Sequence, residues 1–352
     1  MFHLILTACL INQAGACGPI LLPQGDAATQ EACLSQAQRI SDAWLDARQD
    51  LAAGGTACEP TSDLPALPMT EIAPGMLFFA GNPVQLEQSQ DGRIANLAAV
   101  IGDTSVAVID SGVSRAEGQE MYAAIRRVTD KPISHVIATH MHPDHALGAS
   151  VFAEAGAKIV GHHALKLALE TRAQTYLDNM ERLFGAQAMI GTEVVLPDIA
   201  VDDSMTIDLG GRVLDLHAAR TAHTDNDLWL RDRATGTLFS GDLVFRGLTP
   251  IVDGSVLGWL DWLAKAPQPM PRLVVPGHGG VAGDWQDATA PEIRFLKALV
   301  DETRQKIAAG EPMSQAVPDI GAALQPLAGD WNSFDMSVAR NATAAYKELE
   351  WE

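Results

Sequence analysis

The sequence is short of positive charge. Its 352 residues contain 24 Lys and Arg against 44 Asp and Glu, which gives a formal net charge of −20. Nucleic-acid binding needs Lys and Arg gathered on one face, and the sequence has no such cluster. A nucleic acid is therefore not expected as a partner, while the acidity by itself identifies no substrate.

Long apolar runs, internal repeats and low-complexity tracts are also missing. A membrane-spanning helix needs about 20 apolar residues, and no stretch in the body of the chain reaches that length, so we expect no membrane span. With 47% hydrophobic and 19% charged residues, the composition is that of a folded globular protein. The length allows one large domain with an appendage, or two ordinary domains.

Cysteine is absent after residue 58. An even number of cysteines in a short leading segment favours two disulfides that staple a small appendage, and disulfides require an oxidising compartment. The alternative is four buried thiols. The cysteines are Cys9, Cys17, Cys33 and Cys58.

The first residues lack the basic segment that a secretory signal normally carries. They are apolar from Leu4 to Ile11 and are followed by the small-residue run "AGA", so a cleaved signal is one interpretation. The stretch "FHLILTACLI" is bounded by Asn12, Gln13 and Gly15, which favours the other interpretation, a short β-strand.

Apolar runs alternate with helical patterns after a Pro-rich stretch at 58–75, which we interpret as a linker. Residues 114–130 have helical spacing with Ser114 placed as the cap, and a buried strand ending near His140 follows. This alternation predicts an α/β layer, which gives way to short strands from 204 and to helices from about Pro291. Three earlier runs closed by Gly, Asn or Asp are typical of buried strands: 75–81, 94–102 and 105–112.

The stretch "THMHPDHALGAS" crowds titratable side chains that normally repel one another. In an extended strand side chains alternate, so His140 and His142 would point the same way. Pro143 breaks the extended run, which lets Asp144 and His145 turn toward a neighbouring position. A bound metal would offset the crowding, because imidazole and carboxylate groups suit zinc, iron or manganese.

Three further candidates lie in loops that follow apparent strands: His223 in "TAHTDND", Asp242 in "FSGDLVF" and His278 in "VPGHGG". Together with the first cluster they provide enough donors for two metal ions if one carboxylate bridges. The other histidines are interpreted as structural or surface residues, namely His3, His135, His162, His163 and His217.

These motifs resemble those of the metallo-β-lactamase-fold superfamily. "HMHPDH", "AHT", "GDLVF" and "PGHG" match the family's His-x-His-x-Asp-His, His, Asp and His stations in order, over about residues 75 to 290. The resemblance implies two metal sites bridged by Asp242, the first formed by His140, His142 and His223 and the second by Asp144, His145 and His278.

The resemblance also implies a fold, an α/β protein built as a four-layer αβ/βα sandwich with the metals at one edge. On this basis we expect a small Cys-containing, disulfide-stapled segment at 1–65. A catalytic domain of the metallo-β-lactamase fold would span 66–300, and a helical C-terminal extension 301–352.

The expected chemistry is hydrolysis with two Zn²⁺ ions per chain. A hydroxide bridging the metals would attack an ester, thioester, lactone or amide-type bond of a small molecule. The catalytic candidates are Asp144, which holds a metal and shuttles a proton, and Asp110 in "VIDSG". In this superfamily an Asp at the latter position often lies beneath the metals and orients a ligand, whereas the alternative is an ordinary turn residue.

A closer resemblance to the type 2 quinoprotein relay system zinc metallohydrolases rests on the Cys-containing segment, "RIANLAAVIGD", "TAHTDNDLWL", "GDLVFRGLTPIVDGS" and "RNATAAYKELEWE". Membership implies a link to a quinoprotein dehydrogenase system and a periplasmic location, with the cytoplasm as the alternative. Arg246 is a candidate for the pocket wall, and the tryptophans are interpreted as either core or pocket wall, namely Trp229, Trp259, Trp262 and Trp285.

Three competing functions stay open. The first is an iron-dependent persulfide dioxygenase on the same fold, which needs two His and one Asp for a single iron and would leave His145 and His278 spare. A β-lactamase is disfavoured because Asp242 after "SG" resembles the thioesterase, lactonase and general hydrolase branches. A non-catalytic metal-binding accessory is disfavoured because structural zinc sites are closed and Cys-rich.

Overall fold

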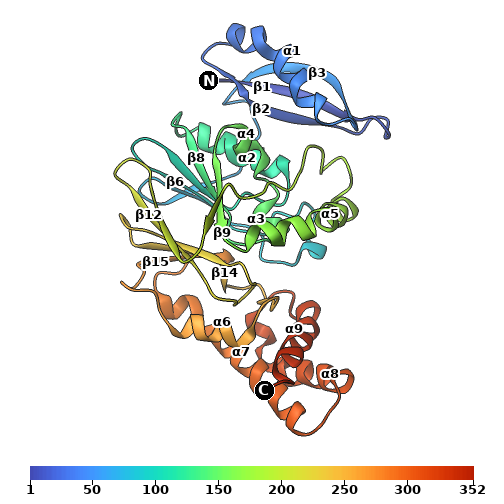
Figure 1. Ribbon diagram of the computed structural model, residues 1–352, viewed down its shortest axis with the longest axis vertical. Coiled ribbons are helices and arrows are strands. Elements are labelled where there is room, and N and C mark those ends of the chain that lie inside the picture. The colour runs from blue at the N-terminus through green and yellow to red at the C-terminus, as the bar shows by residue number, and fades with distance from the viewer.

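Three tiers follow one another along the long axis of the protein, in the order of the chain (Figure 1). A computed structural model describes all 352 residues. The leading segment lies at one end, two β-sheets with their helices occupy the middle, and a group of helices forms the other end. None of the helices is long and apolar enough to cross a membrane.

The leading segment is a three-stranded antiparallel sheet in the order β2-β1-β3, packed against one helix. Disulfides Cys9–Cys17 and Cys33–Cys58 pair all four cysteines, which confirms the two predicted bridges. The first residues form the central strand, so the strand interpretation is confirmed as well. The elements are β1 (Phe2–Leu10), β2 (Cys17–Ala27), α1 (Gln30–Asp46) and β3 (Leu51–Pro60).

A seven-stranded mixed sheet in the order β10-β9-β8-β7-β6-β5-β4 follows. Helix α2 begins as predicted, since the Ser114 hydroxyl accepts the Glu117 N–H. The elements are β4 (Thr70–Ala73), β5 (Met76–Phe79), η1 (Leu86–Gln88), β6 (Leu97–Ile101), β7 (Val106–Ile109), α2 (Arg115–Arg126), β8 (Ile133–Ile137), α3 (Pro143–Ala146), α4 (Ser150–Glu154), β9 (Lys158–His162), α5 (Leu165–Phe184) and β10 (Ile199–Val201).

A five-stranded sheet, β11 to β15 in sequence order, and the C-terminal helices complete the chain. Its elements are β11 (Ser204–Asp208), β12 (Val213–Ala218), β13 (Leu228–Asp232), β14 (Thr237–Phe245), α6 (Val256–Ala264), β15 (Leu273–His278), α7 (Trp285–Ala308), α8 (Met313–Leu324), η2 (Gln325–Asp330) and α9 (Phe334–Leu349).

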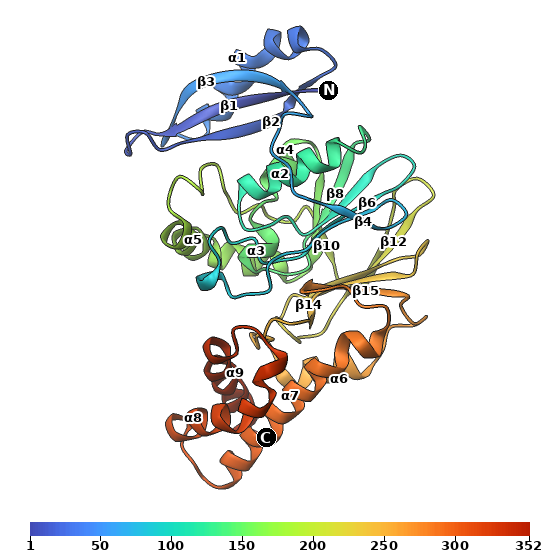
Figure 2. The ribbon, with the colours of Figure 1, turned by 180° about the vertical axis from the view of Figure 1, so that it is seen from behind.

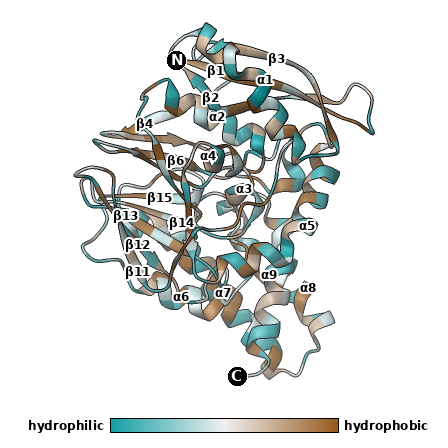
Figure 3. Cartoon of the chain, turned by 45° about the horizontal axis from the view of Figure 1, so that its top comes forward, coloured by the Kyte–Doolittle hydropathy of each residue, from teal (hydrophilic) through white to brown (hydrophobic).

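Alternation along the strands builds the layers, because successive side chains of a strand point to opposite faces. In β7, Val108 packs under α2 and α4, whereas Ile109 faces the second sheet. In β14, Phe239 faces the first sheet and Leu238 faces the C-terminal helices. The predicted four-layer αβ/βα sandwich is therefore confirmed, and Figure 3 shows the apolar strands running between more polar helices.

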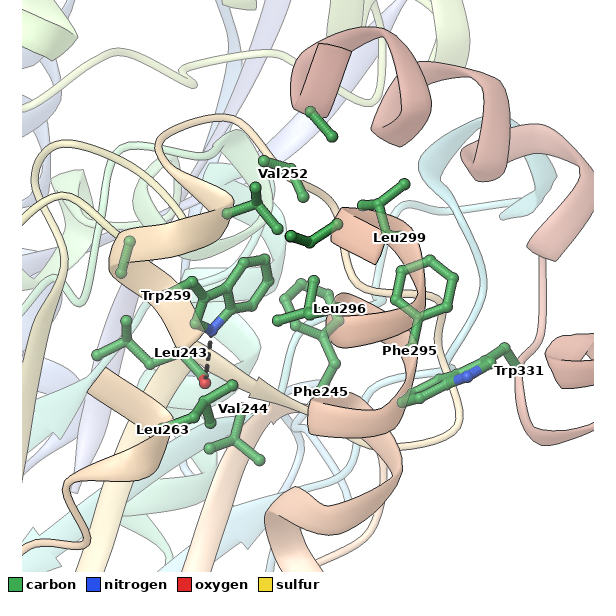
Figure 4. Packing of buried hydrophobic residues seen from close by; sticks show 14 of the residues in the cluster. Leu243, Val244, Phe245, Val252, Trp259, Leu263, Phe295, Leu296, Leu299 and Trp331 are labelled. Atoms are coloured by element: carbon green, nitrogen blue, oxygen red, sulfur yellow. Dashed lines mark hydrogen bonds between the residues drawn. The ribbon is translucent and has the colours of Figure 1, made fainter. Parts of the chain in front are cut away.

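The C-terminal helices share one core with the second sheet (Figure 4). The buried Trp259 of α6 donates its indole N–H to the carbonyl of Leu243 in β14, 3.0 Å away. The predicted boundary between the catalytic domain and the helical extension, at residues 300 and 301, lies inside α7. This helix packs on the second sheet, so the boundary divides an element of the shared core.

The Pro-rich stretch at 58–75 is not a free linker. Its residues Leu64 and Leu67 are buried against the helices of the first sheet, and β4 pairs with β5. The leading segment is fastened by Arg115 of α2, which is fully buried and donates to the carbonyl of Leu21 in β2. Figure 2 shows this segment resting over α2 and α4.

Candidate metal centre

The seven predicted metal ligands come together at one edge of the sandwich. The first motif spans a loop and a short helix, because β8 ends at Ile137 rather than near His140 and Pro143 begins α3. Proline suits the first position of a helix, where its missing N–H is not needed. The other three candidates are His223 in the loop before β13, Asp242 within β14 and His278 at the end of β15.

The first donor group consists of His140, His142, His223 and Asp242, whose donor atoms lie within 4.8 Å of one another. The Nδ1 atom of His142 lies 3.0 Å from His140 Nε2 and 3.1 Å from His223 Nε2. Ligand atoms around a tetrahedral zinc ion are separated by about 3.4 Å. The spacing of the three rings is therefore close to what one metal ion requires.

The second donor group consists of Asp144, His145 and His278. The Nε2 atoms of His145 and His278 are 3.4 Å apart. Asp144 Oδ2 lies 3.4 Å from His145 Nε2 and 3.5 Å from His278 Nε2. Asp242 faces this group too, with Oδ1 at 3.2 Å from His145 Nε2 and Oδ2 at 3.2 Å from His278 Nε2. One carboxylate thus lies between the two groups.

Each histidine of the centre has one ring nitrogen held by an acceptor outside it, which leaves the other turned toward the donor groups. Such contacts fix the tautomer and the orientation of a metal-binding imidazole. In the first group the outward contacts are His140 Nδ1 to Thr139 Oγ1 at 3.0 Å, His223 Nδ1 to Ile251 O at 2.7 Å and His142 Nε2 to Asp253 Oδ2 at 3.1 Å.

In the second group, His278 Nδ1 lies 2.9 Å from the Ile94 carbonyl and His145 Nδ1 lies 2.8 Å from Asp110 Oδ2. Asp110 also accepts two hydrogen bonds from Thr139, one from its backbone N–H at 2.8 Å and one from its side-chain hydroxyl at 2.9 Å. Through Thr139 the same carboxylate reaches His140 of the first group.

Asp110 has a backbone φ of 56°, a left-handed conformation that is uncommon outside glycine and often found at functional sites. Its side chain is buried and fully engaged in the three contacts above. This geometry supports a positioning role for Asp110 rather than that of an ordinary turn residue.

The donor set fits a divalent metal ion. Burial lowers the pKa of His223 to about 3 and, together with His145, holds the pKa of His140 well below its ordinary value, so both rings are neutral, the form that binds metal. Burial disfavours the ionised Asp242, yet His278, His145 and His140 hold its pKa well below the usual range. The buried Oδ1 of Asp242 has no hydrogen-bond partner, which a metal would provide.

A cavity of about 520 Å³ opens above the centre. Its wall includes His142, Asp144, Asp242 and His278. The expectation that Arg246 forms this wall is wrong, and of the two interpretations of the tryptophans the core is confirmed, since none of these residues lines the cavity. Arg246 instead pairs with Asp287 at 2.8 Å, and the tryptophans pack in or against the core of the second sheet, with Trp259 behind the His223 ring.

Sequence reasoning missed Asp253, Arg172, Tyr176 and Arg340, all of which line the cavity. Asp253 lies in the loop between β14 and α6, and no sequence motif marks it. The two residues of α5 belong to a long helix whose polar positions all look alike in the sequence. Arg340 lies in the C-terminal stretch "RNATAAYKELEWE", quoted above for family resemblance only.

Comparison with known proteins agrees with this geometry. The family model described as "Metallo-beta-lactamase superfamily" matches residues 91–278. Acyl-coenzyme A thioesterase MBLAC2 of Bos taurus is 28% identical over 197 residues, which cover 49% of this chain and 64% of the relative. The matched region thus spans less than two thirds of that relative's length.

Two solved structures share the fold. The metallo-beta-lactamase from Pontibacter korlensis has a TM-score of 0.53 at 19% identity, covering 66% of this chain and 99% of that one. The sec-alkylsulfatase Pisa1 from Pseudomonas sp. has a TM-score of 0.61 at 15% identity, covering 80% and 50%. The matched family model and the donor groups agree, and the chain belongs to the metallo-β-lactamase superfamily.

Proposed function

We propose that the protein is a dinuclear zinc hydrolase that cleaves an ester, thioester, lactone or amide-type bond of a small molecule. The supporting observation is the pair of donor groups that share Asp242. A single-metal site would need only one group, and the second would then be a costly cluster of buried imidazole and carboxylate groups without a function.

The chain's own residues would hold the metals and move the proton. His140, His142 and His223 would hold one ion, and Asp144, His145 and His278 would hold the other, while Asp242 faces both donor groups. Bound zinc ions would supply a water molecule whose pKa is lowered toward neutrality. The carboxylate of Asp144 lines the cavity, where it can pass a proton to the leaving group.

A thioester is the bond to test first, because the bovine relative is named an acyl-coenzyme A thioesterase. Purified protein, with no metal added during purification, should contain two zinc ions per chain by elemental analysis. It should release thiol from S-phenyl thioacetate, and a chelator should abolish this activity. One iron per chain with oxygen consumption on a persulfide would instead establish the dioxygenase alternative.

We also propose that the protein belongs to the type 2 quinoprotein relay branch and is located in the periplasm. The two disulfides give weak support, because such bonds persist in oxidising compartments. Mass spectrometry of the native protein, with and without reductant, would test it. Thiols that are free in the protein as isolated would contradict the location.

A further inference from the structure

The cavity above the metal centre has a cationic wall that the metal chemistry does not use. Arg172 and Arg182 of α5 and Arg340 of α9 line it, although acidic residues outnumber basic ones in the chain as a whole, 44 to 24. Two segments far apart in the sequence therefore bring positive charge to one small space.

Arg172 is partly buried and pairs with no carboxylate. Its Nη1 atom donates only to its own helix, to Ala168 O at 3.3 Å and Thr171 Oγ1 at 3.4 Å. The remaining N–H groups of the Arg172 guanidinium have no partner within the protein, and such paired donors match an anion. This side chain is therefore free to bind one.

Arg340 is only loosely engaged. Its Nη2 atom lies 3.8 Å from Asp253 Oδ1, and the other oxygen of Asp253 contacts His142 at 3.1 Å. Asp253 therefore already contacts a residue of the metal centre, and at 3.8 Å it neutralises little of the charge of Arg340. Arg340 keeps donors that face the cavity.

Tyr176, which lies one helical turn after Arg172 on α5, adds a neutral donor to the same wall. Its hydroxyl has no hydrogen-bond partner within the protein, and it lines the same cavity. Burial is the largest cause that raises the pKa of Tyr176 to about 12, so the phenol keeps its proton and can donate it in a hydrogen bond.

The wall of the cavity also has apolar side chains, which include Phe245, Leu248 and Ile251. A ligand that fills the cavity therefore meets the metal ligands, apolar side chains, guanidinium groups and a phenol. A small inorganic anion would leave the apolar side chains uncovered, which favours an organic anion.

We propose that the substrate carries an anionic oxygen group, a carboxylate or a phosphate, beside the bond that is hydrolysed, and that Arg172, Arg340 and Tyr176 bind this group. Guanidinium groups match both anions through paired N–H donors. The inference rests on the proposed hydrolase function and names the class of its substrate.

The kinetic test compares two esters with the same leaving group, mono-4-nitrophenyl succinate, which is an anion, and 4-nitrophenyl butyrate, which is neutral. The metal-loaded protein should prefer the anion in kcat/KM by about tenfold or more, the effect expected of a charged hydrogen bond. Arg172→Gln and Arg340→Gln should each reduce this ratio several-fold, and Arg172→Lys should restore part of it. Arg233→Gln, which removes a surface arginine paired with Asp215, should leave the ratio unchanged.

A binding measurement separates this inference from the hydrolase function. N-phenylsuccinamic acid and phenylphosphonic acid present the carboxylate and the phosphate-like group without an ester, and N-phenylbutanamide is the neutral control. Calorimetry should show that an anion binds at least tenfold more tightly than the control and that Arg172→Gln removes this advantage.

Hydrolysis of both esters with equal efficiency would overturn the anion site and leave the hydrolase intact. Absence of hydrolysis together with arginine-dependent binding of an anion would overturn the hydrolase and uphold the anion site. Anion binding that is unchanged in the double variant Arg172→Gln/Arg340→Gln would assign that binding to the metals and overturn the inference.

Discussion

At the scale of single residues, Asp242 is the side chain on which the two donor groups depend. Its oxygens lie within 3.2 to 3.7 Å of four histidine nitrogens, two from each group. Asp144 contacts only histidines of the second group. The two aspartates thus differ in how many metals they would serve.

Asp242→Ala should therefore lose both metals, whereas Asp144→Ala should lose one. By elemental analysis after dialysis, the zinc content should fall from two ions per chain to near zero in Asp242→Ala and to about one in Asp144→Ala. Circular dichroism serves as the control that both variants fold. Full occupancy in Asp242→Ala would refute the bridging role.

The site residues are the part of the protein that a sequence predicts best, because metal ligands are chemically distinctive and fall in short motifs. His140, Asp242 and His278 all reach the predicted centre. Arg172 and Tyr176 were not predicted, because arginine and tyrosine are common on helix surfaces and form no motif. Their position becomes informative only in the folded protein, where both line the cavity.

At the scale of elements, helix α9 holds the loop that orients the first donor group. Asn341 is fully buried in α9; its Oδ1 accepts the Val252 N–H at 2.9 Å and its Nδ2 donates to Pro250 O at 2.7 Å. Between those two contacts Ile251 offers its carbonyl to His223. The loop therefore links the C-terminal helix to the metal centre.

Asn341→Ala should weaken zinc binding at the first site by up to about tenfold, the lower end of the cost of losing an outer partner of a ligand, because Asn341 acts on His223 only through the Ile251 carbonyl. It should also reduce the free energy of unfolding by about 1–3 kcal/mol, because two buried backbone groups lose their partners. Competition with a chelator and urea unfolding would measure the two effects.

Thr343→Ala is the matched control, since the Thr343 hydroxyl bonds only to Ala339 within α9. If Asn341→Ala lowered stability and left the affinity for both metals at the wild-type level, α9 would have a structural role alone.

At the scale of the whole molecule, the stability of the folded protein should depend on pH through Glu117 of α2. Burial raises the pKa of this carboxyl to about 8 from an ordinary 4.5. The folded state thus keeps a proton that the unfolded state has lost. The stabilisation is fully present below pH 4.5 and disappears as the pH rises through 8.

Glu117→Gln should flatten this dependence. Gln can still accept the Val113 N–H, which Glu117 accepts at 2.8 Å. Between about pH 5 and 7.5, the free energy of unfolding of the wild type should fall more steeply than that of the variant, by about 1.4 kcal/mol per pH unit. Urea unfolding at several pH values measures both slopes, and Glu350→Gln, at an exposed position, is the control. Equal slopes for wild type and Glu117→Gln would show that this carboxyl is ionised in the folded protein.

What the sequence determined by itself was local: strands at 75–81 and 105–112, the Ser114 cap, paired cysteines and the succession of metal motifs. Each can be recognised from residue types and their order along the chain, without knowledge of how distant segments pack. The tertiary structure decided what depends on distant segments, namely the end of β8 before His140, the ordered packing of the Pro-rich stretch, and the placement of Arg340 beside Arg172. Packing sets those features, and packing between segments far apart leaves no short motif to read.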